Sequence, residues 1–70
     1  MNTVRLTSDN VREYIGHQII FRTKNEQTLK LNYIIKELLS VSDSGKSIEI
    51  DYPALDNRLQ IITRDVYVLL

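Results

Sequence analysis

The spacing of hydrophobic residues changes at residue 16 of this 70-residue chain. Upstream of that point, Val11, Tyr14 and Ile15 lie three and four residues apart, which puts them on one face of a helix. A Thr-Ser pair at the start supplies a helix N-cap, and Gly16 suits the left-handed residue that ends many helices. The pattern therefore predicts a short helix over residues 7–16.

Downstream, hydrophobic and polar residues alternate with the period of a β-strand. We expect strands over residues 17–23, 28–42, 47–52, 59–63 and 66–70. The second of these is longer than the usual strand of roughly 3–10 residues. We therefore expect it to bend, or to carry a bulge, where it passes from one sheet face to another.

The long predicted strand has one apolar parity, which we expect to face the core. This parity is interrupted by Glu37 and consists of Leu29, Leu31, Tyr33, Ile35, Leu39 and Val41. The same stretch also contains apolar residues at helical spacing, namely Leu31, Ile34, Ile35, Leu38 and Leu39. A helix over residues 29–39 is therefore the alternative, and it would give an α+β fold.

Five short antiparallel strands joined by tight connections close naturally into a small barrel, which leaves no exposed sheet edge. The predicted order of a short N-terminal helix, a strand, a long bent strand and three further strands resembles that of SH3-like and Sm-like small barrels. The bent second strand after an N-terminal helix is similar to the Sm type in particular. This resemblance is one of topology, and it implies a mostly β, single small β-barrel domain over residues 1–70. Because such barrels carry many functions, it implies no activity.

Composition and charge exclude several classes of protein. Nine Lys and Arg balance nine Asp and Glu, so the chain as a whole has no net charge to attract nucleic acid or anionic lipid. No apolar run approaches the roughly 20 residues that span a bilayer, and the N-terminus lacks an export signal. With no cysteine and with His17 as its single histidine, the chain is expected to hold no disulfide, metal or other cofactor. We expect a soluble, cytoplasmic protein that does not bind membranes.

The sequence GKS at residues 45–47 matches the end of the phosphate-binding loop motif, but that motif needs a glycine where this chain has Ser40. The motif also opens a helix, whereas the residues that follow here alternate as a strand. We interpret residues 43–46 as a hairpin turn whose glycine takes a positive φ. The turn is expected to place Val41 opposite Ile48.

No group of residues supplies the nucleophile, base and orienting group that catalysis needs. Four serines lie near the predicted turn, but His17 is the one histidine that could act as their base. Glu49 and Asp51 fall on the polar side of an amphipathic strand, where carboxylates are solvated or paired with a neighbouring strand. We therefore predict that the protein is not an enzyme and has no small-molecule substrate.

Association with another protein, or with a second copy of itself, is the function that the sequence favours. Several apolar residues fall on the parity opposite the predicted core and would form an exposed patch of the kind that marks an interface. These residues are Ile20, Ile34, Leu38, Ile62 and Leu69. The last predicted strand is apolar on both faces, so its edge is also a candidate for joining a partner's sheet.

Binding of RNA or DNA is the alternative function. If the apolar parity of the long strand faces inward, basic residues on that strand and its neighbour form a basic patch on the outside. The residues of this patch are Arg22, Lys24, Lys30 and Lys36. Overall neutrality and the scarcity of aromatic residues for stacking count against this alternative.

Overall fold

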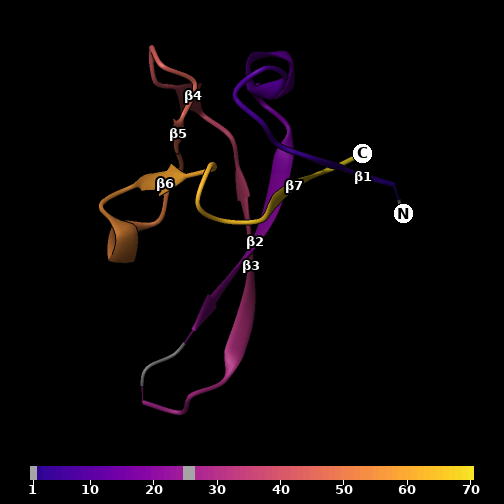
Figure 1. The fold of residues 1–70 in the computed structure, drawn as a ribbon. Helices are drawn as coiled ribbons and strands as arrows, with labels where there is room; N and C mark the ends of the chain where they lie inside the picture. Colours follow the sequence, from indigo (N-terminus) through magenta and orange to yellow (C-terminus); the bar gives the residue numbers. More distant parts are fainter. Residues whose placement is uncertain (1, 25–26) are drawn as a thin grey trace.

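The computed structural model describes residues 2–24 and 27–70, which form a mostly β structure of two antiparallel sheets (Figure 1). This part of the chain contains, in order, β1 (Thr3–Arg5), η1 (Val11–Tyr14), β2 (Gln18–Lys24), β3 (Leu31–Glu37), β4 (Ser40–Val41), β5 (Ser47–Glu49), η2 (Pro53–Leu55), β6 (Arg58–Gln60) and β7 (Val66–Leu69), where η denotes a 3₁₀ turn. The prediction of a mostly β chain is confirmed. The described residues form seven strands rather than the five predicted, however, and they do not form a closed barrel.

The larger sheet has the strand order β1-β7-β2-β3, and the smaller sheet has the order β4-β5-β6. In the larger sheet β2 is paired on both sides, with Ile20 opposite Ile35 of β3 and opposite Tyr67 of β7. The β2–β3 hairpin projects beyond the rest of the molecule (Figure 1). β3 is the last strand in this order and pairs with β2 alone, so it forms one edge of the larger sheet.

The chain passes from one sheet to the other between β3 and β4, at Leu38 and Leu39. The backbone N–H of Leu38 donates to the carbonyl of His17, beside the larger sheet, at 2.9 Å. The next N–H, that of Leu39, donates to the carbonyl of Glu49 in the smaller sheet at 3.0 Å. The bend predicted for this stretch is confirmed, and the alternative of a helix over residues 29–39 is wrong.

The predicted helix over residues 7–16 is wrong, because only Val11–Tyr14 is helical and forms a single 3₁₀ turn. The residues before it make a local hydrogen-bonded loop. The N–H of Thr7 donates to Oδ1 of Asn10 at 2.8 Å, and the N–H groups of Asp9 and Asn10 donate to Oγ1 of Thr7 at 3.2 and 3.3 Å. The bonds to Thr7 are those of a helix N-cap, and the N–H of Val11 donates to the carbonyl of Thr7 at 3.1 Å. The element is short because the N–H of Glu13 donates to the carbonyl of Asn10, three residues back, and that of Gly16 donates to the carbonyl of Leu38 at 2.8 Å.

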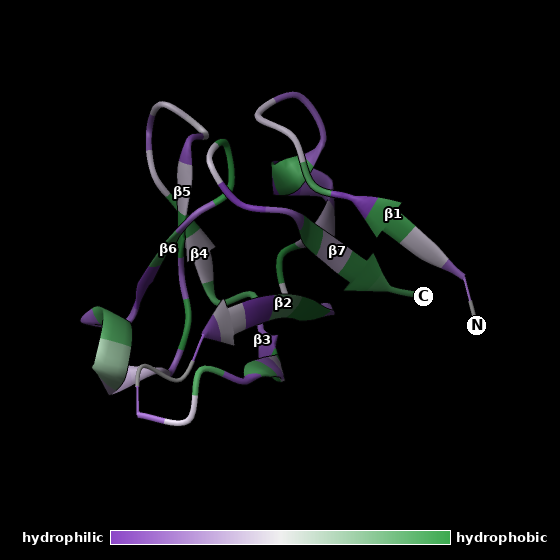
Figure 2. Ribbon diagram, turned by 60° about the horizontal axis from the view of Figure 1, so that its bottom comes forward, coloured by the Kyte–Doolittle hydropathy of each residue, from purple (hydrophilic) through white to green (hydrophobic). Residues whose placement is uncertain are grey.

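The hydrophobic core combines residues of both sheets with residues of the N-terminal segment and of the bend (Figure 2). The buried members are Leu6, Val11, Ile19, Phe21, Leu38, Ile48, Ile50, Leu59, Ile61, Val66 and Val68. No polar or charged side chain of the described residues is buried. Stability therefore rests on apolar burial, at about 25 cal/mol per Å² of surface removed from water.

The apolar parity predicted to face the core is wrong along β3. Leu31, Tyr33 and Ile35 are 57%, 66% and 50% exposed, whereas Ile34 packs against the core. The register explains the difference, because Ile34 lies opposite the buried Phe21 of β2 and directly opposite residues point to the same face. A shift of one residue in the pairing exchanges the two faces of a strand, so the register with β2 determines which face of β3 points to the core.

The turn predicted at residues 43–46 is confirmed, with Val41 opposite Ile48 and Gly45 at φ 73°. This turn packs against the N-terminal segment. A Cβ atom on Gly45 would lie 3.1 Å from the carbonyl oxygen of Ser8. The guanidinium of Arg12 donates to the carbonyls of Ser42 and Asp43 at 3.3 and 2.7 Å. Gly45 therefore serves both the turn geometry and a close approach between two segments.

Candidate functional site

The outer face of the larger sheet, which points away from the core, carries an unusual share of apolar side chains. We define the outer face by the residues that alternate with buried ones on β1, β7, β2 and β3: Thr3, Arg5, Tyr67, Leu69, Gln18, Ile20, Arg22, Lys24, Leu31, Tyr33, Ile35 and Glu37. One row across it runs from Ile35 through Ile20 to Tyr67. The next row places Tyr33 beside Arg22. Apolar and aromatic groups are thus interleaved with basic ones.

The exposed apolar side chains of this face are concentrated on β3. Leu31, Tyr33 and Ile35 project from it in succession, each at least half exposed, and Leu29 just before the strand is 69% exposed. β3 has a hydrogen-bonded partner strand on one side only among the described residues. A long, apolar, unpaired edge of this kind is the feature by which sheets recruit a further strand.

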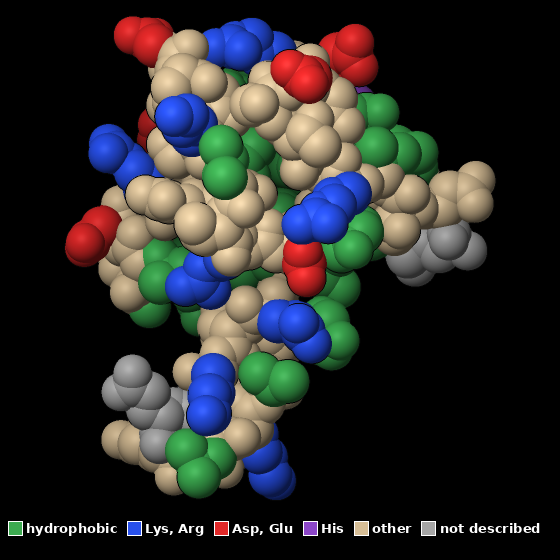
Figure 3. Space-filling view, in the orientation of Figure 1, with side chains coloured by type: hydrophobic (Ala, Val, Ile, Leu, Met, Phe, Trp, Pro, Cys, Tyr) green, Lys and Arg blue, Asp and Glu red, His purple; other side chains and the backbone are tan. Residues whose placement is uncertain are grey.

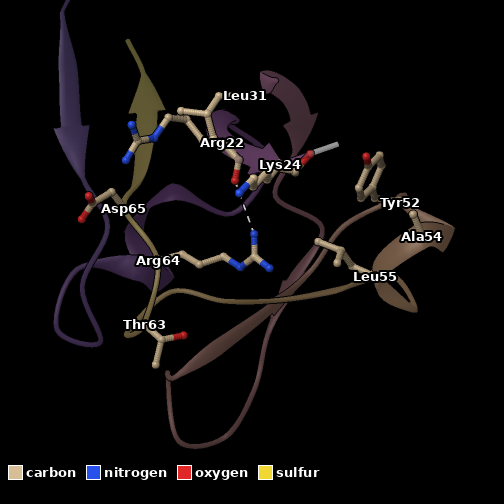
Figure 4. Close-up of a pocket in the computed structure, with 10 residues that line it drawn as sticks. Arg22, Lys24, Leu31, Tyr52, Ala54, Leu55, Thr63, Arg64 and Asp65 are labelled. Atoms are coloured by element: carbon tan, nitrogen blue, oxygen red, sulfur yellow. Dashed lines mark hydrogen bonds between the residues drawn. The ribbon is translucent and has the colours of Figure 1, made fainter. Parts of the chain in front are cut away.

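A groove of about 740 Å³ lies between the β2–β3 hairpin and the segments that contain η2 and residues 63–65 (Figure 4). We call it the basic groove. It is lined by Arg22, Thr23, Lys24, Leu31, Tyr52, Ala54, Leu55, Thr63, Arg64 and Asp65. The side chain of Arg64 extends across the groove toward β2, where its guanidinium donates to the carbonyl of Arg22 at 3.3 Å (Figure 4).

Positive charge dominates this groove although the chain is neutral. Arg22, Lys24 and Arg64 line it, and the one carboxylate in its lining, Asp65, is paired with Arg5 at 2.7 Å. In the view of Figure 3, Lys and Arg side chains gather on the hairpin and at its base, while most of the visible Asp and Glu lie at the other end of the molecule. Lys and Arg side chains are also present at that end, so the hairpin differs from it mainly in its few visible carboxylates.

Tyr52 forms the opposite wall of the basic groove together with the η2 turn (Figure 4). Its ring meets Phe21 edge-on at 6.0 Å between centroids, and Nζ of Lys36 lies 5.9 Å from the ring centroid. The turn is held by Asn57, which has φ 61° and accepts a 2.8 Å hydrogen bond at Oδ1 from the N–H of Tyr52. These contacts hold this wall of the groove in place.

The residues predicted from the sequence to bind a protein partner are not brought together. Ile20 and Leu69 lie half-buried on the outer face, while Ile34 points to the core side of β3. Leu38 is fully buried at the bend, so its prediction as a surface residue is wrong. Ile62 is 52% exposed in the segment between β6 and β7, outside the strands of both sheets.

The basic residues predicted for nucleic-acid binding are partly brought together. Arg22 and Lys24 line the basic groove, and Lys36 lies over the ring of Tyr52 rather than on the outer face. Lys30 is exposed just before β3 and does not line the groove. The prediction missed Arg64, because its segment is distant in sequence and only the fold brings it to β2.

The residues considered for catalysis are engaged in local structure. The ring of His17 packs edge-on against Tyr14, with 5.4 Å between centroids. The hydroxyls of Ser42 and Ser44 lie 3.3 Å apart within the turn, and that of Ser40 donates to Glu49 at 3.0 Å. Within residues 2–24 and 27–70, no three His, Cys, Asp or Glu side chains lie close enough to hold a metal ion. No helix in the same ranges is long and apolar enough to cross a membrane.

Comparison of the chain with models of known protein families, with curated proteins and with solved structures found no match.

Proposed function

We propose that this chain is a non-enzymatic protein-binding module that accepts an additional strand at the edge of β3, with a second copy of the chain as its occupant. The observation that carries this proposal is the seven-residue edge strand with three large apolar side chains at 50–66% exposure. Strand addition satisfies the backbone groups of an exposed edge and gives its alternate side chains new neighbours.

Antiparallel pairing of two β3 strands about Ile34 gives a self-complementary register. Tyr33 of each copy then lies opposite Ile35 of the other, and aromatic pairs with β-branched residues are among the favourable cross-strand pairs. Centring the pair on Tyr33 instead would place Lys30 opposite Lys36, and like charges in this position are destabilising. The charges of β3 therefore favour the first register, which extends the larger sheet through both copies.

We further infer that the two sheets are an open variant of an SH3-like or Sm-like barrel. In this interpretation β3 and β4 are the halves of the long bent second strand, and the bend at Leu38 and Leu39 separates them. The return of β7 to pair with β2 supports it, since barrels of this kind bring the last strand back to the first long one. The edge of β3 is left open in such a variant and is available to a partner.

Cysteine cross-linking tests the register directly, because the chain has no cysteine of its own. Mixing the single variants Tyr33→Cys and Ile35→Cys is expected to give a disulfide heterodimer, since directly opposite residues fall within the roughly 4.4–6.8 Å Cα separation of disulfides. A mass tag on one variant distinguishes the heterodimer on a non-reducing gel. Ile62→Cys, equally exposed but outside the sheet edge, is the matched control. A heterodimer yield no greater than that with the control would overturn the register.

Sedimentation tests the association itself. The wild type is expected to give a species heavier than the 8.2 kDa monomer at high protein concentration. Ile35→Lys is expected to return it to the monomer, because it introduces a charge into the paired edge, whereas Ile62→Lys leaves it unchanged. A wild type that stays monomeric, or two variants that behave alike, would count against pairing at β3.

A further inference from the structure

Leu31 is the one residue of β3 that lines the basic groove, so strand addition at β3 leaves the positive charge of the groove unexplained. Three of its lining residues, Arg22, Lys24 and Arg64, are cationic. Its one carboxylate, Asp65, is already held by Arg5 at 2.7 Å. A neutral chain that gathers unbalanced positive charge around a cavity creates a local field that attracts an anion.

The cations of the groove retain donors for a ligand. Arg64 makes one hydrogen bond to a backbone carbonyl, at 3.3 Å, and a guanidinium carries five N–H donors. Within the described ranges, neither Arg64 nor Arg22 nor Lys24 has a carboxylate within ion-pair distance. Guanidinium and ammonium groups bind phosphate oxygens through short, charge-assisted hydrogen bonds, and arginine does so with two donors at once.

The groove continues onto the outer face of the larger sheet. Arg22 and Asp65 also line a shallow depression of about 240 Å³, whose other residues include Tyr33 and Tyr67. These two tyrosines are 66% and 36% exposed, so their rings are accessible. The surface thus offers cations for phosphates on one side of Arg22 and aromatic rings on the other.

We propose that this continuous surface binds single-stranded nucleic acid, with phosphates of its backbone in the basic groove and unpaired bases on Tyr33 and Tyr67. Cationic grooves beside exposed aromatic rings bind single strands because the backbone is tracked by charge while the bases stack. The groove continues past Arg22 to the tyrosines, and this length of surface favours an extended polymer segment over inorganic phosphate. Bases within a duplex are stacked on one another and do not reach the tyrosines.

Fluorescence anisotropy with a labelled single-stranded DNA of about 12 nucleotides, at low salt, tests the groove. Lys24→Gln and Arg64→Gln are each expected to weaken binding about three- to tenfold and to reduce the salt slope by about one. Arg58→Gln is the matched control, since Arg58 is an exposed arginine on β6 that does not line the groove. Because Arg64 also bonds to β2, Lys24 provides a second variant, whose side chain has no hydrogen bond or ion pair with the residues that the structure describes. Absence of binding by the wild type, or equal losses in all three variants, would overturn the proposal.

Substitutions of Tyr67 test whether bases stack on the tyrosines, at a residue that does not lie on β3. Tyr67→Phe is expected to retain affinity, whereas Tyr67→Ala loses it several-fold, because stacking needs the ring and not the hydroxyl. Equal affinity for a duplex of the same length, or equally strong competition by a mononucleotide or an acidic peptide, would overturn the assignment to single strands. Neither Lys24 nor Arg64 nor Tyr67 lies on β3, so these losses are expected without any change in sedimentation. Tyr33 belongs to both surfaces, so the nucleic-acid site is tested through Lys24, Arg64 and Tyr67, and association at β3 is tested through sedimentation.

Discussion

Replacement of Leu38 by alanine tests how the two sheets are joined. Leu38 is 0% exposed at the bend between β3 and β4, whereas its neighbour Leu39 is 43% exposed. Truncating a buried leucine costs about 2–5 kcal/mol, from the lost transfer free energy of the removed atoms and from the cavity they leave. A chain of 70 residues has a total unfolding free energy of about 4–10 kcal/mol, at roughly 0.05–0.15 kcal/mol per residue. Leu38→Ala is therefore expected to remove a large fraction of the stability.

Urea unfolding followed by circular dichroism measures the effect. With a slope of about 1 kcal/mol per molar urea for a small domain, a loss of about 3 kcal/mol lowers the midpoint by about 3 M. Leu39→Ala is expected to cost less than about 1 kcal/mol, because its side chain is already partly in water. Midpoints for the two variants within about 0.5 M of each other would refute the placement of Leu38 in the core. That result would instead match its prediction from the sequence as a surface residue.

Three further predictions concern local contacts of the backbone. Gly45→Ala is expected to lower the melting temperature more than Gly16→Ala. Both glycines have positive φ, but only at Gly45 would the new methyl group contact a backbone atom, the carbonyl oxygen of Ser8 at 3.1 Å. Equal melting temperatures would contradict this close approach. Asn57→Ala is expected to lower the free energy of unfolding in urea by about 1–2 kcal/mol, because alanine loses the 2.8 Å bond from the N–H of Tyr52 and tolerates φ 61° poorly. Asn57→Gly is expected to lower it less, and the reverse order would show that the left-handed conformation is unimportant. Arg12→Met is expected to lower the free energy of unfolding by about 1 kcal/mol, because it removes the hydrogen bonds to the carbonyls of Ser42 and Asp43. An unchanged urea midpoint would show that these two bonds do not contribute to stability.

The positions of most strands were predictable because they depend on local alternation and turn chemistry. The turn at residues 43–46 was found from its glycine and its polar residues, and the pairing of Val41 with Ile48 followed from it. The bend in the long strand was expected from its length alone. The N-terminal helix was not predictable in its true extent, because the N–H of Gly16 donates to the carbonyl of Leu38, a residue distant in sequence, instead of continuing the helix.

The face of β3 that points to the core was not predictable from β3 itself. One parity of this strand carries Leu31, Tyr33 and Ile35, and the other carries Ile34 between two polar residues, so its own pattern favours the face that the structure leaves exposed. The register with Phe21 decides between the two faces, and that is a contact between strands. The same reversal moved Leu38 from the expected surface into the core and left Tyr33 and Ile35 exposed on the outer face.

The basic groove was half predictable for a related reason. Arg22 and Lys24 alternate along one strand, so the sequence places them on a common face. Arg64 and Tyr52 reach the same cavity only through the folding of segments distant from β2. Net charge was misleading here, because it averages over the molecule and conceals the excess of cations around the groove.

The bend at Leu38 and Leu39 makes the two sheets a single cooperative unit. Strands of the smaller sheet are only two or three residues long, too short to persist without packing against the larger sheet. Their amides can therefore become accessible to solvent only when the shared core opens. Hydrogen–deuterium exchange at Ile48 and Leu59 should then report the same opening free energy as exchange at Ile19 and Val68, the free energy of global unfolding.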